Sequence, residues 1–325
     1  MAANESLSVN FNNLRDLYMK FELAEGICLP VLSVLTVSTN ILLLIAIWKD
    51  PEKNFRSPTT YFLIGLAIAD LLTGMSTEPF FAVYHIMNYQ SGGKPIPRVV
   101  TKLYNIGQSI STVTISSSYL IILGLSISQY IAIKWPHKYK VLITRNRVIV
   151  SVLLSWLYFI CFTLVPSFTP NIDHQLFLKV DLALHPVLIS TILFTTLILL
   201  YRVFSQEVQR RRSYRKSDSQ KGTVRGKSEN LQRQFVIVTF YLAAILLISA
   251  LPHIAIQFVW LYVALSEEGL YYTFMALRVR DLLLFLKVAL DAFIYAWRLP
   301  SYRKALKRSI NHSRRDSKSS VEVKG

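Results

Sequence analysis

LLLFLKVALDAFIYAW, residues 282–297, is an almost wholly apolar stretch that carries one lysine and one aspartate, Lys287 and Asp291. A second apolar stretch, YFLIGLAIADLLTGM at residues 61–75, carries Asp70. A charged side chain at the centre of a bilayer costs roughly 2.5–3.5 kcal/mol on insertion scales, so such residues are rare and usually functional. Lys287 and Asp291 are four residues apart and therefore share one face of a helix. The three charges predict a membrane protein with a polar interior and an ionic cluster inside it.

The composition also indicates a helical membrane protein. Of the 325 residues, 52% are hydrophobic and 17% are charged, whereas a soluble domain usually carries about 25% charged residues. Several apolar runs approach or exceed the ~20 residues that a helix needs to cross a bilayer. These runs are continuous, whereas the strands of a membrane barrel alternate between apolar and polar residues.

The pattern of apolar runs predicts an all-α membrane protein, a seven-transmembrane helix bundle followed by a short amphipathic cytoplasmic helix. We expect an extracellular N-terminal segment at residues 1–26, the bundle at 27–299 and a cytoplasmic tail at 300–325. Prolines at positions 79, 166 and 252 fall inside spans and predict kinks. The predicted spans are 27–48, 59–87, 100–133, 148–168, 182–204, 232–261 and 271–297.

The distribution of lysine and arginine sets the expected orientation. Of the 36 basic residues, 27 lie in or beside the segments between spans 1 and 2, 3 and 4, and 5 and 6, and in the tail, whereas 8 lie on the opposite side. Basic loops remain cytoplasmic. We therefore expect a multi-pass plasma-membrane protein with its N-terminus outside and its C-terminus inside. Attraction to anionic membrane lipid explains the net charge of +17 without a nucleic-acid partner.

The segments outside the predicted spans carry weaker signals. Asn4-Glu5-Ser6 is a glycosylation sequon on the expected outer side. The N-terminal residues do not resemble a cleavable signal peptide, so we expect the first span to direct the chain to the membrane. Residues 210–233 are either solvated extensions of spans 5 and 6 or disordered. Apolar residues at helical spacing in 301–310 predict the amphipathic helix, on the inner leaflet. Cys28 and Cys161 lie inside spans, and no disulfide is expected.

Short motifs spread over most of the spans resemble those of the rhodopsin-like (class A) G-protein-coupled receptors. The resemblance covers roughly residues 27–310, and its strength lies in the order of the motifs and their placement on successive spans. The matching residues are Ser38-Thr39-Asn40, Leu66–Asp70, Ser128-Gln129-Tyr130, Trp135–Tyr139, Trp156, Leu251-Pro252 and Asp291–Tyr295.

The resemblance implies a receptor that binds an extracellular ligand and signals to a heterotrimeric G protein and to arrestin, with span 6 moving about Pro252. Ser128-Gln129 replaces the acidic residue and arginine of the family motif, and a neutral glutamine cannot form an ionic latch. Three behaviours therefore remain possible: constitutive signalling, signalling biased toward arrestin, and loss of signalling. The residues implied at the coupling surface are Ser128, Gln129, Tyr130, Tyr201, expected to face inward, and Tyr295.

Other departures from the family pattern point to a subgroup. Ala292 replaces the span 7 proline, Ala250 replaces the span 6 tryptophan, and span 3 and the second outer loop, expected at about 169–181, lack the paired cysteines. Span 5 lacks a central proline. These features resemble the melanocortin, cannabinoid, lysophospholipid and adenosine receptor group.

The three buried charges fall where the family places a sodium ion, which the resemblance assigns to Asp70, Ser118 and Asp291. Lys287 lies one helical turn outward from Asp291, so we expect its ammonium to take the place of the cation; the alternative is a cluster that only joins spans 2 and 7. The retinal lysine of opsins precedes the motif by six residues rather than four, about 200° around a helix. No cofactor is therefore expected.

The ligand site is expected among polar residues in the outer halves of the spans. Amine receptors carry an aspartate at the position of Ser111, so a non-amine ligand is favoured. We find no nucleophile–base pair, phosphate loop or metal-ligand spacing, so an enzyme is not expected. The candidate ligand-binding residues are Glu78, Gln108, Ser111, His253 and Arg280.

Two other functions remain open at this stage. Intramembrane Asp70, Lys287 and Asp291 would suit a transporter or a proton pathway. Against that reading, the two halves of the chain show no internal repeat of the kind on which transporter folds are built. The third hypothesis is a non-signalling partner or chaperone receptor.

Overall fold

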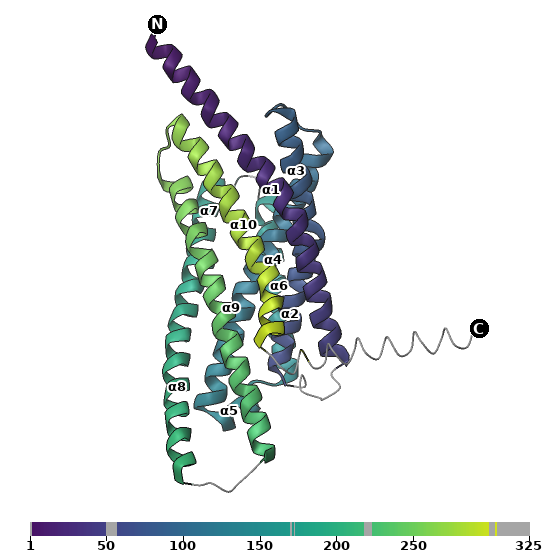
Figure 1. The fold of residues 1–325 in the computed structure, drawn as a ribbon, viewed down its shortest axis with the longest axis vertical. Coiled ribbons are helices and arrows are strands. Elements are labelled where there is room, and N and C mark those ends of the chain that lie inside the picture. The colour runs from purple at the N-terminus through teal and green to yellow at the C-terminus, as the bar shows by residue number, and fades with distance from the viewer. Residues whose placement is uncertain are drawn as a thin grey trace, which may run out of the picture.

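The computed structural model describes residues 2–49, 57–169, 171, 173–217, 223–298 and 303, and gives the backbone alone for 2–10, 211–217, 223–231 and 295–297. These residues form a bundle of long helices, and the described part of the chain contains no strand (Figure 1). The elements are α1 (Ala2–Lys49), α2 (Thr59–Leu72), η1 (Thr73–Thr77), α3 (Glu78–Ser91), α4 (Arg98–Lys134), α5 (Pro136–Leu142), α6 (Arg145–Phe168), α7 (His174–Leu182), η2 (Ala183–Ile189), α8 (Ser190–Ser217), α9 (Thr223–Tyr262) and α10 (Glu267–Arg298).

Two short π-helical turns, η1 and η2, join their neighbours into longer helices. The combined helices α2–η1–α3 and α7–η2–α8 therefore each make one crossing of the bundle. Within the described residues, six helices are long and apolar enough to span a membrane. The seventh, α10, carries Arg278, Arg280, Asp281, Lys287 and Asp291 and packs against α1 and α9. These charges lower the hydropathy of α10 and explain why it is not among the six.

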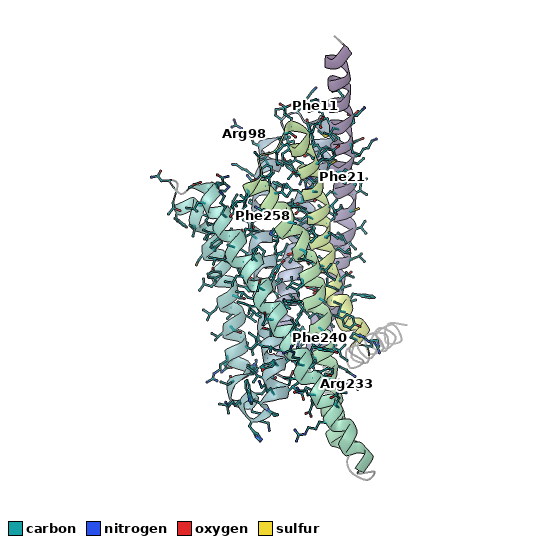
Figure 2. The ribbon with its side chains drawn as sticks, turned by 90° about the vertical axis from the view of Figure 1, so that its left-hand side faces the viewer. Phe11, Phe21, Arg98, Arg233, Phe240 and Phe258 are labelled. Carbon is teal, nitrogen blue, oxygen red and sulfur yellow. The ribbon has the colours of Figure 1, made fainter. Side chains whose placement is uncertain are left out.

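The bundle has two distinct ends, which we name by the view of Figure 1. The upper end carries the α3–α4 connection, α7 and the first turns of α1, and the lower end carries α5, the end of α8 and the start of α9. Figure 2 shows Phe11 and Phe21 on the upper part of α1, Arg98 at the upper start of α4, and Arg233 toward the lower end of α9.

The helices present apolar side chains both to the interior and to the outside of the bundle. Leu66, Ile122 and Leu246 are at most 1% exposed and lie in the central cluster, whereas Leu153 and Leu157 of α6 are 61% and 55% exposed. Exposed leucines are stable in hydrocarbon, where close packing of small residues holds helices together.

The closest approach between α2 and α6 depends on a glycine. A Cβ at Gly65 would lie 2.6 Å from Cγ1 of Val152 on α6. Glycine at this position lets the two backbones come together in the way that small residues do at membrane helix interfaces.

The structure has no boundary at residue 26, where the sequence predicts the start of the bundle. α1 is one helix from Ala2 to Lys49 and contacts both α3 and α10. Leu14, Glu22 and Glu25 are buried within this part of the fold. The sequence pattern missed the extension because Glu22 and Glu25 interrupt the apolar run, although tertiary partners bury them.

The fifth crossing begins earlier than predicted. α7 starts at His174, where the Asp173 carboxylate accepts hydrogen bonds from the backbone N–H groups of Gln175 and Leu176 at 2.9 and 3.3 Å. Such a side chain satisfies N–H groups that have no partner within the helix. The outer loop predicted at 169–181 is therefore shorter, and Pro186 falls inside the crossing, within η2.

Other predicted features have mixed outcomes. Near Pro79, where a kink is predicted, the helix contains the π-helical turn η1. At Pro252, where a second kink is predicted, α9 continues as one helix. Of the two interpretations of residues 210–233, helical extension is correct for the described backbone, since α8 reaches Ser217 and α9 starts at Thr223. The predicted amphipathic helix at 301–310 lies outside the described residues except for Arg303, and the side chain of Asn4 also lies outside them.

Candidate functional site

A cavity of about 190 Å³ lies in the upper half of the bundle between α4, α7, η2, α9 and α10, with Phe81 of α3 at its side. Spacings of three and four residues place several side chains of each helix on the wall. The polar lining consists of Gln108, Ser111, Thr112, Ser116, Asp181, His185, His253, Gln257, Arg280 and Asp281.

Four of the five candidate ligand residues line this one cavity. Gln108 and Ser111 come from α4, His253 from α9 and Arg280 from α10. Glu78 lies elsewhere: it is fully buried, and its carboxylate accepts a hydrogen bond of 3.4 Å from the Thr36 hydroxyl of α1. Glu78 therefore takes part in the α1–α3 contact rather than in the cavity.

Two aspartates on the cavity wall each pair with a nitrogen-bearing side chain. On α10, Nε and Nη2 of Arg280 donate to the same carboxylate oxygen of Asp281, at 2.9 and 2.6 Å. Where α7 meets η2, Nδ1 of His185 lies 2.6 Å from Asp181, and its Nε2 lies 2.9 Å from the Tyr158 hydroxyl of α6. The sequence alone did not single out Asp181 or His185, because they fall near the predicted start of span 5.

The predicted ionic cluster, Asp70, Lys287 and Asp291, lies deeper in the bundle, and we call it the deep cluster. Nζ of Lys287 is 2.7 Å from Oδ2 of Asp291, with side chains 1% and 0% exposed. Asp70 is 2% exposed and lies within electrostatic range of both residues. α2 and α10, which carry these residues, are in contact. Ser118 is buried, but its hydroxyl donates to the Thr114 carbonyl of its own helix at 2.9 Å.

The deep cluster already contains one cationic group, because the Lys287 ammonium contacts Oδ2 of Asp291. Oδ2 of Asp70 and Oδ1 of Asp291 are buried without a hydrogen-bond partner in the described structure. Ser118 directs its hydroxyl to a backbone carbonyl instead. The ammonium brings one positive charge to a site with two carboxylates.

A further charged group, which the sequence did not indicate, joins α1, α3 and α10 at the upper end. We call Glu22, Glu25, His85 and Arg278 the outer cluster. Glu22 lies 2.7 Å from Nδ1 of His85 and 2.8 Å from Nε of Arg278. Glu25 lies 3.5 and 3.6 Å from the same two side chains, and the Tyr18 hydroxyl donates to Glu22. Two glutamates three residues apart, just before an apolar run, are the sequence signal that could have indicated it.

Two of the candidate coupling residues near the lower end, Gln129 and Ser128, form neutral hydrogen bonds. Nε2 of Gln129, which is 2% exposed, donates to the Thr59 hydroxyl at 3.4 Å, and that hydroxyl lies 3.1 Å from the Tyr139 hydroxyl. Gln129, Thr59 and Tyr139 form what we call the lower chain, linking α4, α2 and α5. Burial raises the pKa of the Tyr139 hydroxyl above its ordinary value, so this group stays protonated. The Ser128 hydroxyl donates to the Leu125 carbonyl at 2.7 Å.

The three tyrosines predicted at the coupling surface differ in their surroundings. The Tyr130 hydroxyl accepts a hydrogen bond of 2.7 Å from Lys134. Tyr201 is 63% exposed, with its ring 6.5 Å from that of Phe240, so the expectation that it faces the interior is wrong for this conformation. The side chain of Tyr295 lies outside the described residues.

Comparison with known proteins gives matches to membrane receptors. The dog (Canis lupus familiaris) histamine H2 receptor is 33% identical over 131 residues, which are 40% of this chain and 34% of the relative. The dopamine D2-like receptor of Drosophila melanogaster is 33% identical over 131 residues, 40% of this chain and 14% of the relative. The alpha-1A adrenergic receptor of Cavia porcellus is 27% identical over 143 residues, 44% of this chain and 29% of the relative. The matched segment of this chain spans about a third or less of the length of these relatives.

The family comparison extends over much more of the chain. The sequence model of the 7 transmembrane receptor (rhodopsin) family matches residues 39–295. This range includes the deep cluster, the cavity and the lower chain. The chain therefore belongs to the 7 transmembrane receptor (rhodopsin) family.

Proposed function

We propose that this chain is a G-protein-coupled receptor of the plasma membrane with its N-terminus outside the cell. Its ligand binds in the upper cavity, and its lower end engages a heterotrimeric G protein and arrestin. The observation that carries the proposal is the convergence of Gln108, Ser111, His253 and Arg280 from three helices on one cavity. Clefts with a few convergent polar groups in a mainly apolar wall are typical ligand sites.

The route from the cavity to the lower end runs along α9. His253 lines the cavity directly after Pro252, which cannot donate a backbone hydrogen bond and so weakens the helix locally. A ligand that contacts His253 in one conformation better than in another shifts the population of the two states. Because α9 reaches the lower end, a rotation about Pro252 would move the surface that faces a G protein.

The lower chain sets how strongly the resting state is held. A neutral hydrogen bond contributes about 0.5–1.5 kcal/mol net, and Gln129 offers no charge for an ionic latch. We infer that the resting conformation is only weakly held, so that basal coupling is measurable. Basic residues near the lower end favour anionic membrane lipid as a further partner.

G-protein dissociation in cells without added ligand tests this function. Wild type and Gln129→Arg are expressed at matched surface levels with a panel of G-protein sensors, and arrestin recruitment is measured in parallel. We expect wild type to dissociate at least one G protein above cells without receptor, and Gln129→Arg to change that level. Silence of both proteins in every G-protein and arrestin sensor would overturn the proposal in favour of a non-signalling partner.

The deep cluster carries a second part of the proposal. We infer that Lys287 is a built-in cation that balances Asp70 and Asp291, in place of the sodium ion that the family resemblance implies. Two carboxylates facing one ammonium leave one negative charge, so the three groups titrate jointly. The receptor is then expected to respond little to sodium.

A transporter or proton pathway lacks support from the comparisons. The family match is to receptors and covers both helices of the deep cluster. A receptor can use such a cluster to join helices and to bias a conformational equilibrium without moving ions.

A further inference from the structure

We propose that the upper cavity binds a small ligand with a protonated amine, and that Asp181 is the residue that binds the ammonium group. The inference deepens the proposed receptor function, on which it rests, by assigning the chemical class of the ligand. Amine receptors carry an aspartate at the position of Ser111 on α4, and on that ground alone the sequence favoured a non-amine ligand. The cavity supplies a carboxylate from the α7 side instead.

The position of Asp181 is set by a relay of hydrogen bonds. The Tyr158 hydroxyl lies 2.9 Å from Nε2 of His185, and Nδ1 of His185 lies 2.6 Å from Oδ1 of Asp181. A neutral imidazole with its hydrogen on Nδ1 satisfies all three groups, since it donates to Asp181 and accepts from Tyr158. Three rings, those of Tyr158, Phe159 and Phe162, pack around the imidazole. In this tautomer the imidazole orients Asp181 without placing a positive charge beside it.

The other charges on the wall compensate one another. Arg280 uses Nε and Nη2 on one oxygen of Asp281, and the second oxygen lies 4.0 Å from Nη1 of Arg278. Among the described residues of the cavity wall, Asp181 contacts no lysine or arginine. With His185 in its neutral form, the Asp181 carboxylate is the one charge on the described wall that no cation balances. The Asp181 side chain is 32% exposed, so its free oxygen can accept from a ligand.

An anionic ligand fits the same cavity less well. It would have to compete with Asp281 for Arg280, and it would bring a second negative charge close to Asp181. Like charges in a poorly hydrated site repel each other strongly. A cation instead restores charge balance, and pairing lowers the cost of burying both groups.

The rest of the cavity fits a compact apolar body. Ile115, Tyr119, Leu182, Ile189 and Leu284 line it, and its volume of about 190 Å³ lies below the ~300–1,000 Å³ typical of drug-sized pockets. Nδ1 of His253 is buried without a hydrogen-bond partner in the described structure, so it is available to a second polar group on the ligand. A small arylalkylamine combines these properties.

Thermal unfolding of the purified full-length receptor tests the assignment with matched probes of three charges. The probes are 2-phenylethylamine, the neutral 2-phenylethanol and the anionic 3-phenylpropionate, supported by a panel of small primary, tertiary and quaternary amines. We expect amines to raise the melting temperature of the wild type more than their alcohol counterparts do. Asp181→Asn should weaken amine binding roughly 10- to 100-fold, because a hydrogen bond to a charged group is lost, while Asp181→Glu retains part of it.

The matched control is Asp173→Asn, which changes an exposed aspartate near the start of α7 that does not line the cavity. It should bind amines like the wild type. Melting temperatures measured without ligand identify any variant that fails to fold. Tyr158→Phe removes only the hydrogen bond to His185, so it should weaken amine binding several-fold. The proposal is overturned if no amine stabilises the wild type, if Asp181→Asn binds amines normally, or if the anion binds through Arg280. Basal G-protein dissociation uses no ligand, so failure of the receptor function is recognised separately.

Discussion

The upper and lower halves of the bundle hold their helices together in different ways. The upper half uses ion pairs, in the outer cluster and along the cavity wall, and the deep cluster beneath it does the same. The lower chain uses only neutral hydrogen bonds of 3.4 and 3.1 Å. Removing one member of a buried ion pair leaves an unpaired charge and costs several kcal/mol, whereas a neutral hydrogen bond contributes about 1 kcal/mol. We infer that the upper half is rigid and selects the ligand, while the lower half rearranges at little cost.

The largest effect is expected from the deep cluster. Lys287→Met leaves Asp70 and Asp291 buried without a cation and should lower the free energy of unfolding by about 3–5 kcal/mol. Thermal unfolding in NaCl and in choline chloride at equal ionic strength measures the change. We expect sodium to stabilise this variant and to leave the wild type unchanged.

The double variant Lys287→Met with Asp291→Asn serves as the control for this prediction. It removes one charge of each sign, so most of the lost stability should return. An equal response of wild type and Lys287→Met to sodium would show that the lysine does not act as a built-in cation.

The outer cluster should give the next largest effect. Arg278→Met removes the cation that faces Glu22 and Glu25, and we expect a loss of about 3 kcal/mol in thermal unfolding. Lys20→Met, at an exposed position on α1, should stay within about 0.5 kcal/mol of the wild type. If Arg278→Met were as stable as this control, α1 would not be held by charge and the comparison between the halves would fail.

The lower chain should affect signalling more than stability. Gln129→Ala removes one neutral hydrogen bond and should cost about 1 kcal/mol, while basal G-protein dissociation rises because the resting contact is lost. Thermal unfolding measures the loss of stability, and a G-protein sensor without ligand measures the rise in basal dissociation. A large loss of stability without any signalling change would assign Gln129 to packing alone.

The smallest effect concerns pH. Burial raises the pKa of Tyr139, so the folded state favours the protonated hydroxyl. Its stabilisation is therefore fully present below the ordinary tyrosine value of about 10 and is lost only above it. The difference in unfolding free energy between wild type and Tyr139→Phe should stay below about 1 kcal/mol and be the same at about pH 6 and pH 9. A difference that changes between these two pH values would mean that another group titrates in the lower chain.

Several site residues could be predicted from the sequence because each carries its own signal. Asp70, Lys287 and Asp291 stand out as charges in apolar runs, and the spacing of the last two predicts their pairing, which the structure contains at 2.7 Å. Gln129 stands out as a departure from a motif. Asp181 gives no such signal, because an acidic residue near the predicted end of a span is ordinary at a membrane surface. For Glu22, the signal is only its spacing from Glu25 just before an apolar run.

By itself the sequence determined the helical class, the crossings and the family, since hydropathy, basic-residue distribution and motif order are properties of the chain. Which side chains meet was decided only by the tertiary structure. Three features depend on how the helices rotate and pack: the contact of Glu22 and Glu25 with Arg278, the outward position of Tyr201, and the pairing of Asp181 with His185. The physical reason is that the cost of a buried charge depends on its partners, and those partners come from other helices.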